Sequence, residues 1–261
     1  MTQHDWERRI NRARQLAQEY SAAAEVLTFY AEIAAFQQAV FDAAVRQNLH
    51  ADPMRPFGEQ LVASAPLDRF PALLELVGSK GPAGLAKGAR ELRQQGPDQW
   101  RLLLASQPDG TDPTQDFFAR VYLQPIAERL AADADFQITG YTGVLCPICN
   151  GKPQLSVLRP EGDGGKRSLL CSCCSTEWDF RRILCPNCSE KDPGKLQRFS
   201  AEDFPHMRIE ACDTCKRYQK GVDLTINGLA VPIVDEIAAV PLDLWAAEQG
   251  YGKIALNVMG L

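Results

Sequence analysis

The chain has 261 residues, of which 45% are hydrophobic, and it carries a formal net charge of −5. This length suits one large domain or two smaller ones, and the composition is that of a globular protein, which excludes an intrinsically disordered chain. The first twenty residues mix charged and apolar side chains, unlike a secretory signal, and no later stretch approaches the roughly 18 apolar residues of a membrane span. We therefore expect a cytoplasmic protein with no membrane association.

The charge is spread evenly along the chain. Residues 1–139 contain 14 basic and 18 acidic side chains, and residues 140–261 contain 14 and 15. The basic clusters near the cysteines, Arg181-Arg182 and Lys216-Arg217 with Lys220, are typical of a solvated surface. Because a nucleic-acid-binding face needs a basic excess, we expect no nucleic-acid partner.

Two amphipathic helices are predicted at the start of the chain. Residues 6–20 place apolar side chains three or four positions apart, from Trp6 to Tyr20. Residues 22–48 carry a wider apolar face, which predicts the centre of a helical bundle. That face contains Val26, Phe29, Tyr30, Ile33, Phe36, Val40, Phe41, Ala44 and Val45.

Proline and glycine residues interrupt the sequence between Asp52 and Pro113, so only short helices fit there. We place these helices at 57–63, 69–77, 82–95 and 98–106. Thr114 has the residue type of an N-cap for a further helix over 115–132, with a kink at Pro125. The sequence therefore predicts an all-helical domain over residues 1–139.

The pattern changes near residue 136. Short β-prone stretches at 155–158, 168–170 and 206–209 each border a pair of cysteines. The glycine-rich run 162–165 lacks the ending of a phosphate-binding loop and predicts a hairpin turn. An apolar stretch at 234–249 predicts a final helix. The expected fold class is therefore α plus small β.

All nine cysteines lie between Cys146 and Cys215. Clustered cysteines in a cytoplasmic protein indicate metal ligands or redox centres, because that compartment keeps thiols reduced. Two residues between paired cysteines let one tight turn aim both sulfurs at one ion, and Asn150-Gly151 suits the left-handed conformation such turns need. The predicted metal ligands are the paired cysteines Cys146, Cys149, Cys171, Cys174, Cys185, Cys188, Cys212 and Cys215.

A four-ligand site needs two of these pairs. The intervals of 21 residues between Cys149 and Cys171 and of 23 between Cys188 and Cys212 are typical of four-cysteine ribbons. Sequential pairing predicts one metal module at 140–184 and a second at 185–261 that includes the final helix. Interleaved pairing is an alternative, and so is a disulfide or thiol redox centre. Four sulfurs suit zinc and iron alike, and such a closed shell leaves no position for metal-dependent hydrolysis.

Cys173 is surplus to both sites and could be a buried small residue, an alternative ligand or a reactive thiol. Trp178 fits a lid packed over the first ribbon, and His206 would be a ligand only in place of a cysteine. His4 and His50 fit surface or capping roles. We find no nucleophile triad, phosphate loop or pair of catalytic carboxylates, so neither an enzyme nor a small-molecule substrate is expected.

The sequence resembles the FdhE family, the accessory proteins for formate dehydrogenase formation. The resemblance rests on the four cysteine pairs, on Ser175-Thr176-Glu177-Trp178 directly after the second pair, and on residues 245–251 near the end. Residues 28–37 are similar to the early helix of the family. The chain departs from the family pattern at Cys173, at Asn150, where glycine is usual, and in a shorter N-terminal region.

The resemblance implies two rubredoxin-like modules that hold iron at the eight paired cysteines. It also implies a non-enzymatic, cytoplasmic maturation role, through contact with the catalytic subunit of respiratory formate dehydrogenase before that subunit is exported. On the residues alone, zinc fits the spacing equally well. Two other functions stay open: a rubredoxin-like electron-transfer protein and a zinc-ribbon nucleic-acid-binding protein.

Overall fold

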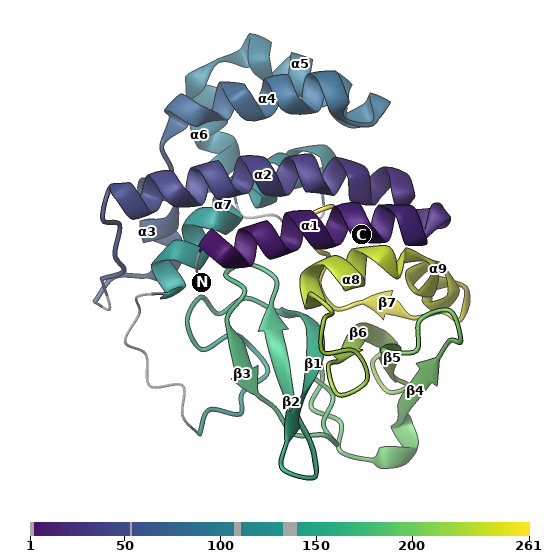
Figure 1. The fold of residues 1–261 in the computed structure, drawn as a ribbon. Coiled ribbons are helices and arrows are strands. Elements are labelled where there is room, and N and C mark those ends of the chain that lie inside the picture. The colour runs from purple at the N-terminus through teal and green to yellow at the C-terminus, as the bar shows by residue number, and fades with distance from the viewer. Residues whose placement is uncertain (1–2, 53, 107–110, 133–139) are drawn as a thin grey trace.

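The structure is a computed structural model that describes residues 3–52, 54–106, 111–132 and 140–261, and its first half is helical (Figure 1). This part confirms the predicted all-helical character, although the predicted boundary at residue 139 lies outside the described residues. Its helices are α1 (Gln3–Glu19), α2 (Ala24–Arg46), α3 (Phe57–Ala63), α4 (Phe70–Lys80), α5 (Ala83–Gln95), α6 (Pro97–Ala105) and α7 (Pro113–Ala132), with single 3-10 turns η1 (Ser21–Ala23) and η2 (Leu67–Arg69). In the described part of the chain, no helix is both long and apolar enough to cross a membrane.

α2 is the central helix of the bundle. Its side chains Leu27, Tyr30 and Ile33 are buried, and Gln37 donates from Nε2 to the main-chain oxygen of Val121 on α7 at 3.0 Å. The same Nε2 donates to Gln124 Oε1 at 3.1 Å, and these two bonds offset the cost of burying the amide N–H groups. Val45, which the periodicity assigned to the apolar face, is instead 46% exposed, because the helix ends one residue later.

The start of α7 corrects the predicted N-cap. The Oδ1 atom of Asp112, and not Thr114, accepts the main-chain N–H groups of Thr114 at 2.9 Å and Gln115 at 3.0 Å. Pro113 occupies the first helical position, where its missing N–H group is not needed, so the cap falls one residue before it. The helix continues through Pro125 to Ala132.

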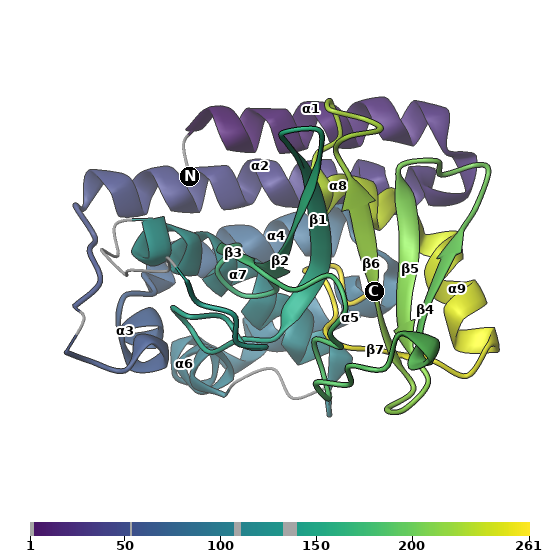
Figure 2. The ribbon, with the colours of Figure 1, turned by 90° about the horizontal axis from the view of Figure 1, so that it is seen from below.

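The second half forms one mixed sheet (Figure 2). Its strand order is β3-β2-β1-β6-β5-β4, and β7 pairs with β6. Neighbouring strands are antiparallel except that β1 and β7 each run parallel to β6. The strands are β1 (Pro153–Glu161), β2 (Gly164–Cys171), β3 (Glu177–Asp179), β4 (Leu196–Ser200), β5 (Met207–Cys212), β6 (Arg217–Asp223) and β7 (Gly252–Lys253), with a 3-10 turn η3 (Pro193–Lys195) before β4.

The hairpin predicted at residues 162–165 joins β1 to β2 and is confirmed, with Gly162 at φ +54° and Glu161 opposite Gly164. The single helix predicted over 234–249 is two helices, α8 (Pro232–Ala238) and α9 (Val240–Glu248). The chain bends at Ala239, two residues before Pro241, which cannot donate the main-chain bond that a continuous helix needs.

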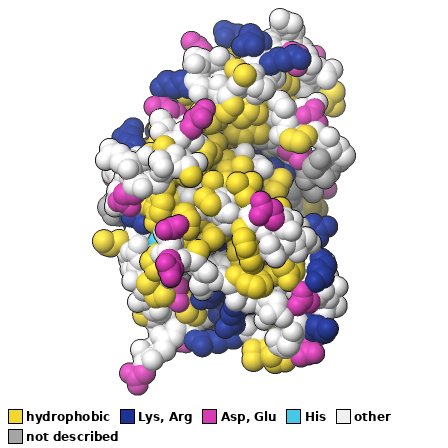
Figure 3. Space-filling model, turned by 90° about the vertical axis from the view of Figure 1, so that its right-hand side faces the viewer, with side chains coloured by type: hydrophobic (Ala, Val, Ile, Leu, Met, Phe, Trp, Pro, Cys, Tyr) yellow, Lys and Arg dark blue, Asp and Glu magenta, His cyan; other side chains and the backbone are white. Residues whose placement is uncertain are grey.

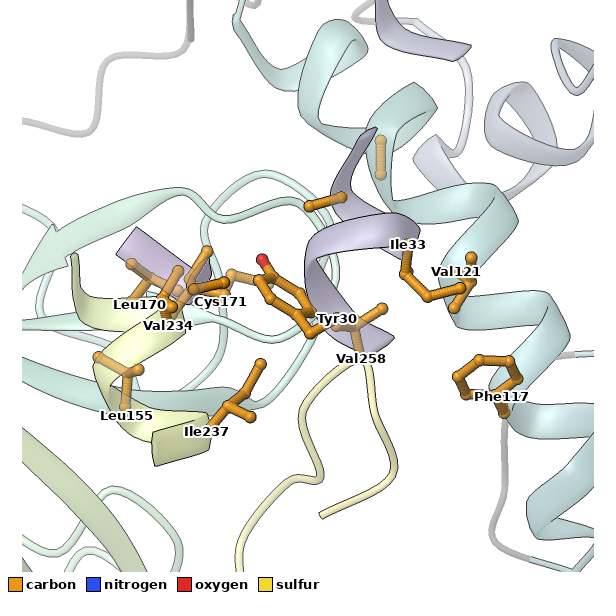
Figure 4. Packing of buried hydrophobic residues seen from close by; sticks show 14 of the residues in the cluster. Tyr30, Ile33, Phe117, Val121, Leu155, Leu170, Cys171, Val234, Ile237 and Val258 are labelled. Atoms are coloured by element: carbon orange, nitrogen blue, oxygen red, sulfur yellow. The ribbon is translucent and has the colours of Figure 1, made fainter. Parts of the chain in front are cut away.

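The bundle and the sheet share one hydrophobic core. Figure 4 shows side chains of α2 and α7 on one side, with side chains of β1, β2 and α8 on the other. α8 lies beneath α1 and α2 (Figure 1). The residues labelled in Figure 4 are Tyr30, Ile33, Phe117, Val121, Leu155, Leu170, Cys171, Val234, Ile237 and Val258.

An ion-pair cluster also joins the two halves. Asp235 on α8 accepts hydrogen bonds from Arg12 of α1 at 2.6 and 3.0 Å and contacts His206 Nε2 at 2.8 Å. Burial would raise the pKa of Asp235, but the hydrogen bonds from His206 and Arg12 hold it below its usual value. His206, weighed above as a ligand in place of a cysteine, is buried in this cluster.

Candidate metal centres

The four cysteine pairs share one backbone unit, which we call a knuckle: the CxxC turn and the residue after it. That residue has a positive φ in every case: Asn150 at 59°, Ser175 at 54°, Ser189 at 61° and Lys216 at 52°. The left-handed conformation expected of Asn150 is therefore present at all four turns. It reverses the chain so that both sulfurs of a pair project to the same side.

Main-chain hydrogen bonds close the turns that end at Asn150, Ser189 and Lys216. The Asn150 N–H group donates to the Cys146 oxygen at 3.0 Å, and the matching bond from Lys216 to Cys212 is 2.8 Å. Main-chain N–H groups also approach sulfur, as from Gly151 to Cys149 Sγ at 3.4 Å and from Cys173 to Cys171 Sγ at 3.3 Å. Such donors stabilise thiolates.

The sheet brings the knuckles together in two groups. The knuckle that precedes β1 meets the hairpin between β2 and β3, and the knuckle that precedes β4 meets the hairpin between β5 and β6. The first sulfur group is Cys146, Cys149, Cys171 and Cys174, and the second is Cys185, Cys188, Cys212 and Cys215. The pairing is thus sequential and not interleaved.

The sulfur–sulfur distances fit tetrahedral sites. Within the first group they include 3.3 Å from Cys149 to Cys171 and 3.6 Å from Cys146 to Cys174, and within the second group 3.7 Å from Cys188 to Cys212. Four sulfurs held about 2.3 Å from one metal ion in a tetrahedron lie about 3.8 Å apart. A disulfide would need about 2.05 Å, and all nine cysteines are free.

The ionisation of the thiols is coupled within each group. Hydrogen bonds from Cys149 and Cys171 lower the pKa of Cys146. The pKa of Cys171 is raised, and its largest cause is the hydrogen bond between Cys171 and Cys146. Burial raises the pKa of Cys185 and of Cys188. Crowded, partly buried thiols lose all their protons only when a cation balances the charge, and a divalent metal with four sulfur ligands supplies that balance.

The first sulfur group is held to the helical half by a contact, which we call the anchor, that the sequence did not reveal. Ser175 Oγ donates to Glu128 of α7 at 2.5 Å, and Glu128 pairs with Arg9 Nη1 of α1 at 3.0 Å. Burial raises the pKa of Glu128 above its usual value, although Arg9 opposes the shift. Ser175 belongs to the segment that follows the second cysteine pair, but Glu128 belongs to no motif, so only the folded chain shows that they meet.

The remaining candidates lie beside the sites. Cys173 is half-buried, not buried, and its side chain lines a cleft of about 1150 Å³ between α3, α7 and the first sulfur group. Trp178 is buried on β3 and donates from Nε1 to the Gly143 oxygen at 3.0 Å. His50 is exposed and contacts Asn48, and the side chain of His4 lies outside the described residues.

Two family models match the second half of the chain. A model described as "FdhE, central domain" matches residues 145–182, and one described as "FdhE, C-terminal domain" matches residues 183–259. Each matched segment contains one complete sulfur group.

One relative extends the match over nearly the whole chain. A "Protein FdhE homolog" of Pseudomonas putida is 31% identical over 97% of this chain and 86% of its own length. A relative with the same description from Aquifex aeolicus is 38% identical over 58% of this chain and 53% of its own length. The crystal structure of the FdhE protein from Pseudomonas aeruginosa has the same fold, with a TM-score of 0.74 at 24% identity, covering 99% of this chain and 96% of that one. The chain is a member of the FdhE family.

Proposed function

We propose that this chain is a non-enzymatic, cytoplasmic accessory protein for the formation of active formate dehydrogenase. It binds the catalytic subunit of the respiratory enzyme before export and carries one metal ion in each sulfur group. Its eight ligands are the paired cysteines, and its organisation is a helical domain at 1–139 with metal modules at 140–184 and 185–261. The observation that carries this proposal is the pair of four-sulfur groups in a chain of the FdhE family.

We propose iron as the metal, because the family resemblance implies rubredoxin-like modules that hold iron. The sulfur–sulfur distances support a tetrahedral ion but are equally compatible with zinc. Because four sulfurs fill the shell, the sites support holding and positioning a partner, or passing electrons, and not activation of a water molecule.

Two surfaces support protein binding. On the face shown in Figure 3, hydrophobic side chains gather on the side where Figure 1 places α9. α9 presents Leu244, which is 64% exposed, and the half-buried Trp245, which packs on Phe199 with ring centroids 4.7 Å apart. The cleft of about 1150 Å³ adds apolar walls that include Leu61 and Leu123. Exposed apolar patches of this kind mark interaction sites.

The experiment compares formate-dependent dye reduction in extracts of the source organism with and without this gene, while the catalytic subunit is quantified in both. The proposal expects activity to fall although the subunit is still present, and the tagged chain to co-purify with that subunit. Unchanged activity together with absent co-purification would refute it.

Electron transfer is the second candidate. The exposed Cys188 favours it, because a sulfur ligand at the surface shortens the path for an electron to a partner. Reversible one-electron reduction of the iron-loaded protein is the expected result, and a protein purified with zinc in both sites would exclude it.

A further inference from the structure

A smaller hollow, of about 310 Å³, lies where the two metal modules meet. Its wall includes Cys185 and Cys212 of the second sulfur group. Arginines reach it from four segments: Arg167 on β2, Arg182 in the segment after β3, Arg198 on β4 and Arg217 on β6. Glu210 of β5 is the one acidic side chain in this lining. Four thiolates with a divalent metal in the second sulfur group carry a charge of about −2, so the four arginines still leave the hollow with a net positive charge.

Glu210 is already neutralised. Its Oε2 atom lies 2.5 Å from Arg167 Nη2, and its Oε1 atom lies 2.8 Å from Arg208 Nη2. Burial would raise the pKa of Glu210, but these two arginines hold it well below its usual value. Its charge is therefore not available to the other three arginines.

Those three arginines have only main-chain acceptors. Arg198 donates to the Arg182 oxygen at 3.1 Å, Arg217 donates to the Lys253 oxygen at 3.5 Å, and Arg182 donates to the Gly165 oxygen. Within the described residues, none of the three forms an ion pair with a carboxylate. A guanidinium has five N–H donors, so one hydrogen bond to a main-chain oxygen leaves most of them facing the hollow or solvent.

The rest of the wall is apolar. It includes Ile183, which is 54% exposed, together with Leu184, Pro186, Leu196 and Ile254. An inorganic anion would use the arginines alone. A carboxylate on a hydrocarbon frame would use both kinds of wall, because planar guanidinium forks match carboxylates and aliphatic carbons match the apolar side.

We propose that this hollow binds carboxylate groups on a short hydrocarbon frame, carried either by a free dicarboxylic acid or by the acidic side chains of a partner segment. The bound carboxylates pair with Arg182, Arg198 and Arg217, at the seam between the two modules and beside the second sulfur group. This inference does not depend on a role in formate dehydrogenase formation.

The test uses isothermal titration calorimetry on the full-length, metal-loaded chain. The probes are succinate, a blocked peptide of alternating glutamate and leucine, and inorganic phosphate. The variants Arg198→Gln and Arg217→Gln should each weaken binding of the carboxylate probes about tenfold, the loss expected for one charge-assisted hydrogen bond. Arg93→Gln on α5, an exposed arginine outside the hollow, is the matched control and should change nothing.

The two sources are distinguished by the probes. Tighter binding of succinate indicates a free dicarboxylic acid, and tighter binding of the peptide indicates a partner segment. Phosphate that binds as tightly as either would overturn the proposal, because it would show general anion attraction. If no probe binds, the proposal is wrong. A change in the metal-site absorption spectrum of the arginine variants would then show that the arginines balance the charge of the second sulfur group.

Discussion

The two sulfur groups share one backbone design but have different surroundings. In the first group Cys146, Cys171 and Cys174 are buried. The knuckle that ends at Ser175 is bound to Glu128 of the helical half. In the second group Cys188 is exposed and Cys215 is half-buried. The knuckle therefore specifies how the four sulfurs converge, whereas the packing around it decides whether a site is part of the core or open to solvent and partners.

Loss of a metal ligand should have the largest effect and should differ between the groups. Binding of a structural metal at such sites contributes about 10–16 kcal/mol to folding. We expect Cys149→Ser to abolish metal binding in the first group and to loosen α1, and Cys188→Ser to remove only the second metal. Metal content per chain and thermal unfolding measure this. Cys173→Ser is the control and should keep both metals; full metal content in Cys149→Ser or Cys188→Ser would defeat the ligand assignment.

The anchor of the first group gives the next largest effect. Glu128→Gln removes the carboxylate that pairs with the buried Arg9 and accepts from Ser175. Breaking a buried pair typically lowers the free energy of unfolding by about 3–5 kcal/mol, and we expect a loss at the lower end, because burial already disfavours the ionised carboxylate. Urea denaturation should show this loss. Glu91→Gln removes an exposed pair with Lys87 and is the control, with an expected change of at most about 0.5 kcal/mol. Equal effects in both variants would mean that the anchor is not special.

The C-terminal half has its own buried charges, and the pH dependence of Glu236 runs opposite to that of Glu128. These charges include Lys220, which was expected on a solvated surface but is fully buried. Glu236 pairs with Lys220 at 3.0 Å and Lys253 at 2.5 Å. Burial would raise its pKa, but Lys220 and Lys253 lower it to about 2. A lowered folded-state pKa adds stability that is present above the unfolded value of 4.5 and is lost as pH falls toward about 2. For Glu128, whose folded-state pKa is raised above the unfolded value of 4.5, the ionised form is the less favoured one, so its contribution to stability is lost as pH rises from 4.5 upward.

The difference in unfolding free energy between wild type and Glu236→Gln should therefore be largest near pH 7, at roughly 3 kcal/mol, and should shrink below pH 4.5. Taking the difference between two metal-loaded proteins cancels the acid sensitivity that their metal sites share. A difference that stays constant down to pH 3.5 would contradict the assigned ion pairs.

The smallest effect concerns the residues with a positive φ at the ends of the knuckles. Ser189→Gly should stabilise the second module by about 0.5–1 kcal/mol, because glycine adopts a positive φ without steric cost. Ser175→Gly removes the same strain but also the hydrogen bond to Glu128, so its net effect should be near zero or destabilising. Thermal unfolding of the two variants side by side checks this, and equal stabilisation would show that the anchor contributes nothing.

Local patterns predicted much of the fold. The periodicity of residues 22–48 predicted α2, the proline and glycine positions delimited α3 to α6, and the cysteine spacing predicted the sequential sulfur groups that the structure contains. These features depend on residues close in sequence or on a repeated turn, so they can be read without knowing the fold.

Features that depend on distant contacts were missed. The parallel pairing of β1 with β6 joins Leu155 to Lys220 and has no local signal. The short strands β3 and β7 have no local signal either, because each forms only when a neighbouring strand is already in place. The contacts of Glu128 and Asp235 across the two halves were invisible for the same reason, since a charged residue in a helix sequence usually indicates a solvated surface.

The ion pair between Arg12 and Asp235 has a consequence for synthesis of the chain on the ribosome. The two residues lie 223 positions apart, so α1 lacks this partner until 223 further residues have been added after Arg12. Arg9, also on α1, can bond to Glu128 once 119 further residues have been added. The bundle can therefore close around α1 in an earlier step. At the usual rate of about 5–20 residues per second, the guanidinium of Arg12 is made tens of seconds before the carboxylate of Asp235 that it binds.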